Sequence, residues 1–66
     1  MSVLKVVEIL SNSTQSWEDA TKKGVEKASE TIKGIKSAYV KEFSTVVKDG
    51  TVTEYRVNLK ITFEVK

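Results

Sequence analysis

Residues 51–65 alternate apolar and polar side chains, and this run is too long for the rest of the chain to cover. At ~3.3 Å per residue, a strand of this length extends ~50 Å. The one segment with helical periodicity, about residues 16–33, extends only ~27 Å at 1.5 Å per residue. One helix cannot cover such a strand, so its overhang must curl, project or lie against neighbouring copies. We expect neighbouring copies to cover it.

Two further segments complete a β-α-β-β order. Residues 37–47 and 51–65 flank Asp49-Gly50, a dipeptide that favours a two-residue hairpin turn. Residues 3–10 are rich in β-branched side chains and apolar on both faces, which is typical of a strand covered on both sides. We therefore predict an α+β fold and a single domain over residues 1–66, in which a three-stranded antiparallel sheet carries one helix on a face.

The helix has its own start and stop signals. Ser16 followed by Asp19 resembles a capping box, and Gly34 is the left-handed residue expected after the last turn. Gly24 costs up to ~1 kcal/mol relative to Ala in a helix interior, so we expect the helix to approach a strand closely there, with an ordinary tolerated glycine as the alternative. Trp17 lies on the apolar stripe, which favours a core position over a ligand platform.

The turn also predicts which side chains of the hairpin share a face. If Asp49 and Gly50 are the only loop residues, Phe43 lies opposite Arg56 and Tyr39 opposite Lys60. The face away from the helix then carries Ser37, Tyr39, Lys41, Phe43, Arg56, Asn58 and Lys60. The helix side carries Val40, Val57, Leu59 and Ile61, with Glu42 as a misfit among them. A one-residue bulge would reverse the assignment.

The composition removes several function classes. The 66 residues include no cysteine and no histidine, which excludes disulfides, thiolate or imidazole zinc sites and catalysis by either side chain. A chain this short forms a marginal core, so self-association is the remaining stabiliser. The net charge of +2 is interleaved along the chain, which argues against a nucleic-acid partner. No signal peptide or membrane span is visible, so we expect a cytoplasmic protein without membrane contact.

Several short segments, in their order and spacing, make the chain resemble the dodecin family over nearly its whole length. These segments are "KVVEILSNST", "SWEDATKKGVEKAS", "VKEF" and "VTEYRVNLKITFEV". The resemblance implies a hollow spherical homododecamer whose sheets wrap the helices. It also implies a protein without catalytic residues. Many dodecins bind stacked pairs of flavins at subunit interfaces, with proposed roles in flavin storage, buffering and photoprotection.

The resemblance also indicates a changed ligand site. In flavin-binding dodecins a tryptophan of the second strand stacks on the flavin, and a glutamine of the last strand hydrogen-bonds its polar edge; these positions fall on Ser37 and Arg56. A serine offers no aromatic stack, worth ~0.5–1.5 kcal/mol beyond ring burial, and an arginine only donates hydrogen bonds. We expect weak flavin binding or none. Arg56 would favour an anion or pair with Glu42, and Tyr39 or Phe43 would serve as a substitute ring or fill an interface.

Carboxylates are the other candidate ligands. A symmetric shell gathers copies of one side chain around its axes, so Asp49, Glu54 or Glu64 could form oxygen-rich sites for calcium or magnesium. Within one chain they are ordinary solvated charges, and this is the interpretation that we prefer.

These observations predict a non-enzymatic, dodecin-like homododecamer with a modified flavin-type site that holds another small ligand or cations. One alternative is a storage protein for FMN or riboflavin. A second is a small protein-interaction module that uses its exposed strand face. The sequence leaves the identity of the ligand open among these flavins and the divalent cations.

Overall fold

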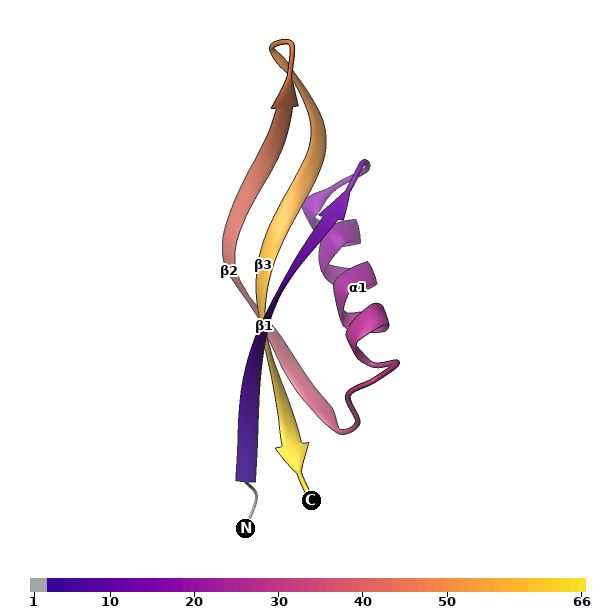
Figure 1. Ribbon diagram of the computed structural model, residues 1–66, viewed down its shortest axis with the longest axis vertical. Coiled ribbons are helices and arrows are strands. Elements are labelled where there is room, and N and C mark those ends of the chain that lie inside the picture. Colours follow the sequence, from indigo (N-terminus) through magenta and orange to yellow (C-terminus); the bar gives the residue numbers. More distant parts are fainter. Residues whose placement is uncertain (1–2) are drawn as a thin grey trace.

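The computed structural model describes residues 3–66 and contains one antiparallel sheet with a helix on one face (Figure 1). The strands are β1 (Val3–Ser13), β2 (Ile35–Lys48) and β3 (Thr51–Val65), and the helix is α1 (Trp17–Ala28). β3 lies in the centre, antiparallel to β1 on one side and to β2 on the other. The predicted β-α-β-β order and the bounds of the last strand are confirmed, whereas β1 continues three residues further than predicted.

The helix is shorter than the sequence predicts. It ends at Ala28, with Ser29 as its C-cap, instead of continuing to residue 33. Gly34 does adopt a left-handed φ of 77°, but it lies beyond the cap and directly before β2. There its carbonyl accepts a hydrogen bond from the Glu64 N–H at 3.0 Å. α1 therefore extends only ~18 Å, and the β2–β3 hairpin projects beyond it (Figure 1).

The hairpin turn has the predicted two-residue form. Asp49 and Gly50 both adopt left-handed backbone conformations, with φ of 52° and 75°, as a type I′ turn requires. Tyr39 pairs with Lys60 as predicted. The turn sets the register of the first two pairs, and the agreement at Tyr39 is restored only after two irregularities that cancel each other.

Two β-bulges change the faces of the β2 residues that lie between them: Thr53 is an extra residue of β3 near the turn, and Lys41 is an extra residue of β2 further along. Glu42 lies opposite Asn58 and Phe43 opposite the buried Val57. The predicted pairing of Phe43 with Arg56 is wrong, as is that of Lys41 with Asn58, because the extra residue Thr53 in β3 shifts the register by one until the bulge at Lys41 restores it. Glu42 is consequently no misfit, since it lies on the face away from α1, and Phe43 lies on the helix side.

The core is small, and α1 approaches the sheet very closely within it. Its buried hydrophobic residues are Ala20, Ala28, Val57, Leu59 and Ile61. A Cβ at Gly24 would lie 2.9 Å from Leu59 Cδ1 and 3.0 Å from Ser11 Cβ. The Ser11 hydroxyl also donates a hydrogen bond to the Ala20 carbonyl at 2.7 Å. The expected close approach at Gly24 is confirmed.

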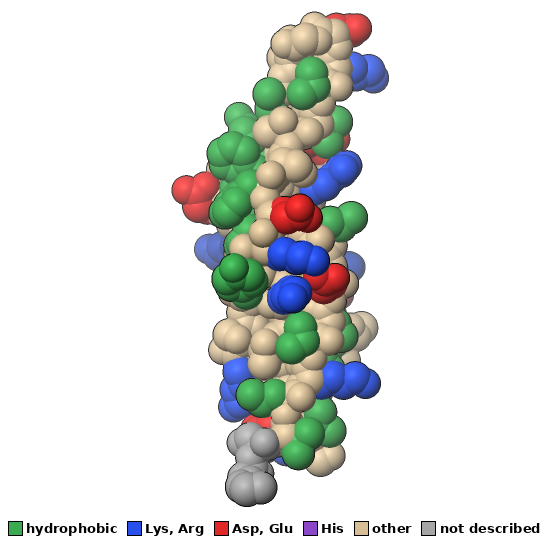
Figure 2. All heavy atoms as spheres, turned by 90° about the vertical axis from the view of Figure 1, so that its left-hand side faces the viewer, with side chains coloured by type: hydrophobic (Ala, Val, Ile, Leu, Met, Phe, Trp, Pro, Cys, Tyr) green, Lys and Arg blue, Asp and Glu red, His purple; other side chains and the backbone are tan. Residues whose placement is uncertain are grey.

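Much of the apolar surface remains uncovered in the single chain. The accessible surface is 4884 Å², whereas a compact monomer of 7.4 kDa exposes ~4,200 Å². The radius of gyration is 13.4 Å, against ~11 Å for a compact domain of this length. Figure 2 shows hydrophobic side chains along the length of one side, interrupted by a central group of charged side chains. No helix within residues 3–66 is long and apolar enough to cross a membrane.

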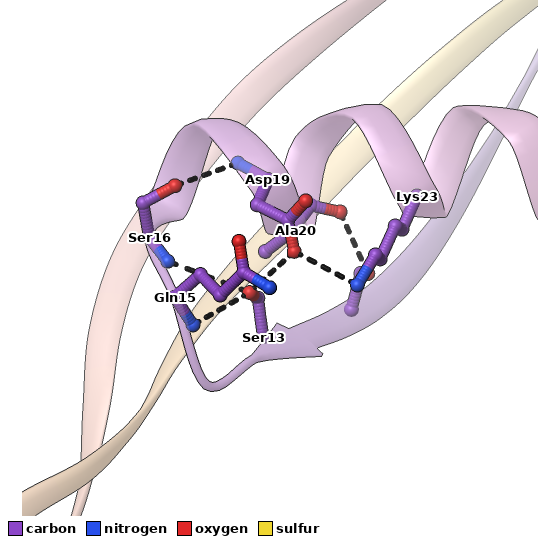
Figure 3. Close-up of polar contacts among 7 residues, drawn as sticks. Ser13, Gln15, Ser16, Asp19, Ala20 and Lys23 are labelled. Carbon is purple, nitrogen blue, oxygen red and sulfur yellow. Dashed lines mark hydrogen bonds and ion pairs between the residues drawn. The ribbon is translucent and has the colours of Figure 1, made fainter.

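A polar cluster joins the end of β1 to the start of α1 (Figure 3). Ser16 Oγ accepts a hydrogen bond from the Asp19 N–H at 2.9 Å, which confirms Ser16 as the N-cap. The Asp19 carboxylate does not complete the capping box; it accepts from the buried Ser13 hydroxyl at 2.6 Å and pairs with Lys23 at 3.1 Å. Ser13 Oγ in turn accepts from the Gln15 N–H at 2.9 Å.

Replacing Gly24 with Ala should destabilise the protein although alanine is the better helix former. We expect the overpacking against Leu59 and Ser11 to cost ~1–3 kcal/mol and to exceed the ~1 kcal/mol gained in helix propensity. Denaturant unfolding measures the difference, with the exposed Glu26→Ala on the same helix as control. A Gly24→Ala variant as stable as the unmodified protein would contradict the close approach.

Acid should weaken the link between β1 and α1. The hydrogen bond from Ser13 and the contact with Lys23 lower the pKa of Asp19 below its ordinary value. The Asp19 carboxylate therefore contributes stability above that ordinary pKa, and the contribution is lost as the pH falls through the lowered pKa. Unfolding of the unmodified protein and of Asp19→Asn as a function of pH tests this. The advantage of the unmodified protein should be largest at neutral pH and vanish in acid; an advantage independent of pH would refute it.

Candidate functional site

The face of the sheet opposite α1, called the outer face below, carries four of the five predicted ligand residues. Ser37 and Tyr39 lie opposite Thr62 and Lys60 on this face. Glu42 and Arg56 share it, because they alternate with the buried residues of β3 that face the helix. Phe43 was predicted to lie with them and instead lies on the helix side, opposite Val57, because of the bulge at Thr53.

Ser37 and Arg56 lie far apart on the outer face. Ser37 is opposite Thr62, and β3 rises ~20 Å between Thr62 and Arg56. This separation exceeds the length of a three-ring flavin, so one ligand cannot contact both residues of the same chain. The predicted site is therefore two separate places, and a site that uses both needs a second copy.

Arg56 has a partner that sequence reasoning missed. Its Nε donates a hydrogen bond to Asn12 Oδ1 at 2.9 Å, and the two residues lie opposite each other across β1 and β3. Within residues 3–66, Arg56 forms no ion pair with Glu42, the partner expected from the sequence. The turn sets only the register of β2 against β3, so no signal in the chain pointed to Asn12.

A second missed pair crosses the middle of the outer face. Lys41 Nζ lies 3.0 Å from Glu8 Oε1 and so connects β2 to β1 across β3. The hydrogen bond and the charge of Glu8 raise the pKa of Lys41 above its ordinary value. Both side chains are exposed, and such pairs are worth ~0–1 kcal/mol. Tyr39, with 67% of its surface exposed, stands beside this pair.

An aromatic cluster lies on the other face, where α1 begins. The Trp17 ring meets Phe43 and Tyr55 edge to face, at centroid distances of 5.8 and 5.2 Å. Trp17 Nε1 donates a hydrogen bond to the Ser44 carbonyl at 3.0 Å, on the edge strand β2. Trp17 thus packs against the core as predicted, but its ring also forms the wall of a groove.

We call this hollow of about 530 Å³ the Trp17 groove. It is lined by Trp17, Glu18, Thr21, Lys22, Val40 and Phe43. Its walls are mostly aromatic and aliphatic, and the charged side chains of Glu18 and Lys22 stand at its rim. Sequence reasoning placed Phe43 on the outer face and therefore missed this groove.

The three carboxylates considered as cation ligands do not meet in one chain. Asp49 lies in the hairpin turn, and Glu54 and Glu64 lie on β3, which rises ~33 Å between them. Glu64 lies 3.7 Å from Lys36 Nζ. The part of the chain that the structure describes contains no group of three acidic side chains able to hold a metal ion. A cation site made from these residues would need more than one copy.

The fold and the site define a class of small β-α-β-β proteins in which one short helix covers part of a long, twisted sheet and leaves its outer face uncovered. The chain belongs to the dodecin family, whose family model matches residues 3–66. The family and fold predicted from the sequence are thereby confirmed.

Known relatives agree with this assignment. Calcium dodecin of Mycobacterium tuberculosis is 33% identical over 66 residues, which cover all of this chain and 93% of the relative. The crystal structure of calcium dodecin from that organism, described as calcium-chelating with a novel calcium-binding site, is 32% identical with a TM-score of 0.87 over 98% of this chain and 93% of that one. An arginine-to-alanine variant of Thermus thermophilus dodecin is 27% identical with a TM-score of 0.92, over 100% and 98%.

Phe43 and Tyr39 should respond differently to truncation, because they lie on opposite faces. Phe43→Ala removes an edge-to-face contact of Trp17, worth ~0.5–1.5 kcal/mol, and should shift the Trp17 emission to longer wavelength. Trp17 is the only tryptophan of the chain, so intrinsic fluorescence reports on this cluster alone. Tyr39→Ala is the matched control and should leave the emission unchanged. Equal shifts in the two variants would contradict the placement of Phe43 on the helix side of the sheet.

Proposed function

We propose that this chain is a non-enzymatic binding protein that assembles into a hollow homododecamer. We further propose that the assembly binds divalent cations in preference to flavins. The proposal on assembly rests on surface that the single chain leaves uncovered, and the proposal on ligands rests on the residues of the outer face and on the relatives described above.

The uncovered apolar surface is the observation that carries the assembly. Leu4, Val6 and Leu10 of β1 lie on the outer face with 55%, 51% and 67% of their surface exposed. The chain exposes roughly 700 Å² more than a compact monomer of its mass, close to the ~800 Å² that each partner buries in a standard interface. Neighbouring copies that cover β1 and the projecting hairpin would supply the missing core.

The outer face supports weak flavin binding. Ser37 offers no ring for stacking, and Arg56 is already engaged by Asn12. Phe43 lies on the other side of the sheet, so it is no substitute for the missing ring. Tyr39 remains as the exposed ring next to Ser37, and it supports the second candidate function, a flavin-binding store in which Tyr39 takes over the stacking contact.

The relatives support cation binding. A calcium-chelating dodecin that is 32% identical matches nearly the whole chain. Asp49, Glu54 and Glu64 stay the candidate ligands, and they would act by meeting their own copies around a symmetry axis. Carboxylate oxygens are the ligands that calcium prefers, and bringing several carboxylates together costs free energy that a bound cation offsets.

The mass of the protein in solution and its ligand titrations test the proposal together. We expect a mass near twelve times 7.4 kDa, a higher melting temperature with calcium than with a chelator, and flavin binding by FMN or riboflavin fluorescence that is weaker than micromolar. Ser37→Trp should raise flavin affinity by about tenfold through the restored stack, whereas the control Lys48→Trp, at the exposed end of the same strand beside the turn, should not.

Each of these measurements can also contradict one part of the proposal. A monomeric mass would refute the assembly and favour the protein-interaction module. Submicromolar flavin binding by the unmodified protein would favour the flavin store with Tyr39 as its ring. A melting temperature that does not respond to calcium or to chelation would refute the cation site.

A further inference from the structure

We propose that the Trp17 groove is a docking site for a second copy of this chain, which inserts Leu10 from the outer face of its own β1. The inference rests on the self-assembly proposed above and identifies two surfaces that meet in it. The same contact would cover the two kinds of apolar surface that a single chain leaves exposed, one on each face of the sheet.

The groove offers a concave apolar surface at an open edge of the sheet. Trp17, Val40 and Phe43 form its walls, and Phe43 is 60% exposed. A volume of about 530 Å³ accommodates more than one aliphatic side chain. The edge of β2 beside it pairs with no strand in the described chain, so a neighbour can approach from this side.

Leu10 is the best candidate to fill the groove, because it is as exposed as any large hydrophobic residue of the chain, at 67%. It lies in a row across the sheet with Asn58 and Glu42. The row therefore presents an apolar side chain and, at its other end, the exposed carboxylate of Glu42.

The rim of the groove offers the complementary groups. Lys22 lines the groove and forms no ion pair in the part of the chain that the structure describes. With Leu10 of another copy between Trp17 and Phe43, the Lys22 ammonium would pair with the Glu42 carboxylate in the same row of that copy. Apolar and charged complementarity thus point to the same partner.

The two surfaces lie on opposite faces of one sheet, and this determines the type of contact. The groove is on the helix side, whereas Leu10 and Glu42 are on the outer face. Each copy would therefore use different surfaces toward its two neighbours, which is a heterologous contact. Such contacts close into rings when the rotation between copies allows it, as a closed shell requires.

A charge exchange tests the contact without removing apolar side chains. Lys22→Glu and Glu42→Lys should each raise the concentration at which the assembly dissociates by about tenfold, because like charges then face each other. The double variant should restore assembly to the level of the unmodified protein. Lys33→Glu, an exposed lysine outside the groove with the same change in net charge, is the control. A double variant no better than the singles would overturn the pairing.

A mixing experiment tests the heterologous geometry. Leu10→Asp and Phe43→Asp should each lose this contact when alone, while far-ultraviolet circular dichroism reports that they remain folded. Mixed, they should associate one to one, because each supplies the surface that the other lacks. Two variants that keep the mass of the unmodified protein, or a mixture that forms no mixed species, would overturn the proposal. An unmodified protein that is itself monomeric would instead refute self-assembly, and the docking site with it.

Discussion

The β3 strand is the element on which the rest of the structure depends. It pairs with both other strands along most of its length, and its buried side chains, Val57, Leu59 and Ile61, form most of the core with two alanines of α1. A twelve-residue helix covers only the middle of this fifteen-residue strand. Because a strand rises more than twice as far per residue as a helix, no helix of this length could cover it. The exposed apolar surface is a direct consequence.

The contact between α1 and the sheet is close where it does occur. Gly24 lets the helix backbone approach Leu59 and Ser11, and the Ser13–Asp19 cluster holds the helix start at the end of β1. At that end Trp17 covers the base of the projecting hairpin, and its Nε1 donates a hydrogen bond to the Ser44 carbonyl. The helix is therefore held to the sheet at one point of close packing and at one polar cluster. The Trp17 groove forms where α1 stops covering the sheet.

Much of the fold followed from local patterns. The alternation over residues 51–65, the Asp49-Gly50 turn and the Ser16 N-cap each report on backbone geometry that neighbouring residues decide. The helix end did not follow, because Gly34 serves the start of β2 rather than a helix cap. The faces of Glu42 and Phe43 did not follow either, since a one-residue bulge at Thr53 leaves no local signature and reverses the β2 side chains up to the second bulge at Lys41.

The amino-acid sequence by itself determined the order of elements and the family, because these depend on residue type and spacing along the chain. Only the tertiary structure decided that Ser37 and Arg56 are ~20 Å apart, that Asn12 holds Arg56, and that Phe43 joins Trp17 in a groove. The reason is physical. Register between strands is set by the sum of many hydrogen bonds and packing contacts between distant segments, and no short stretch of sequence contains that sum.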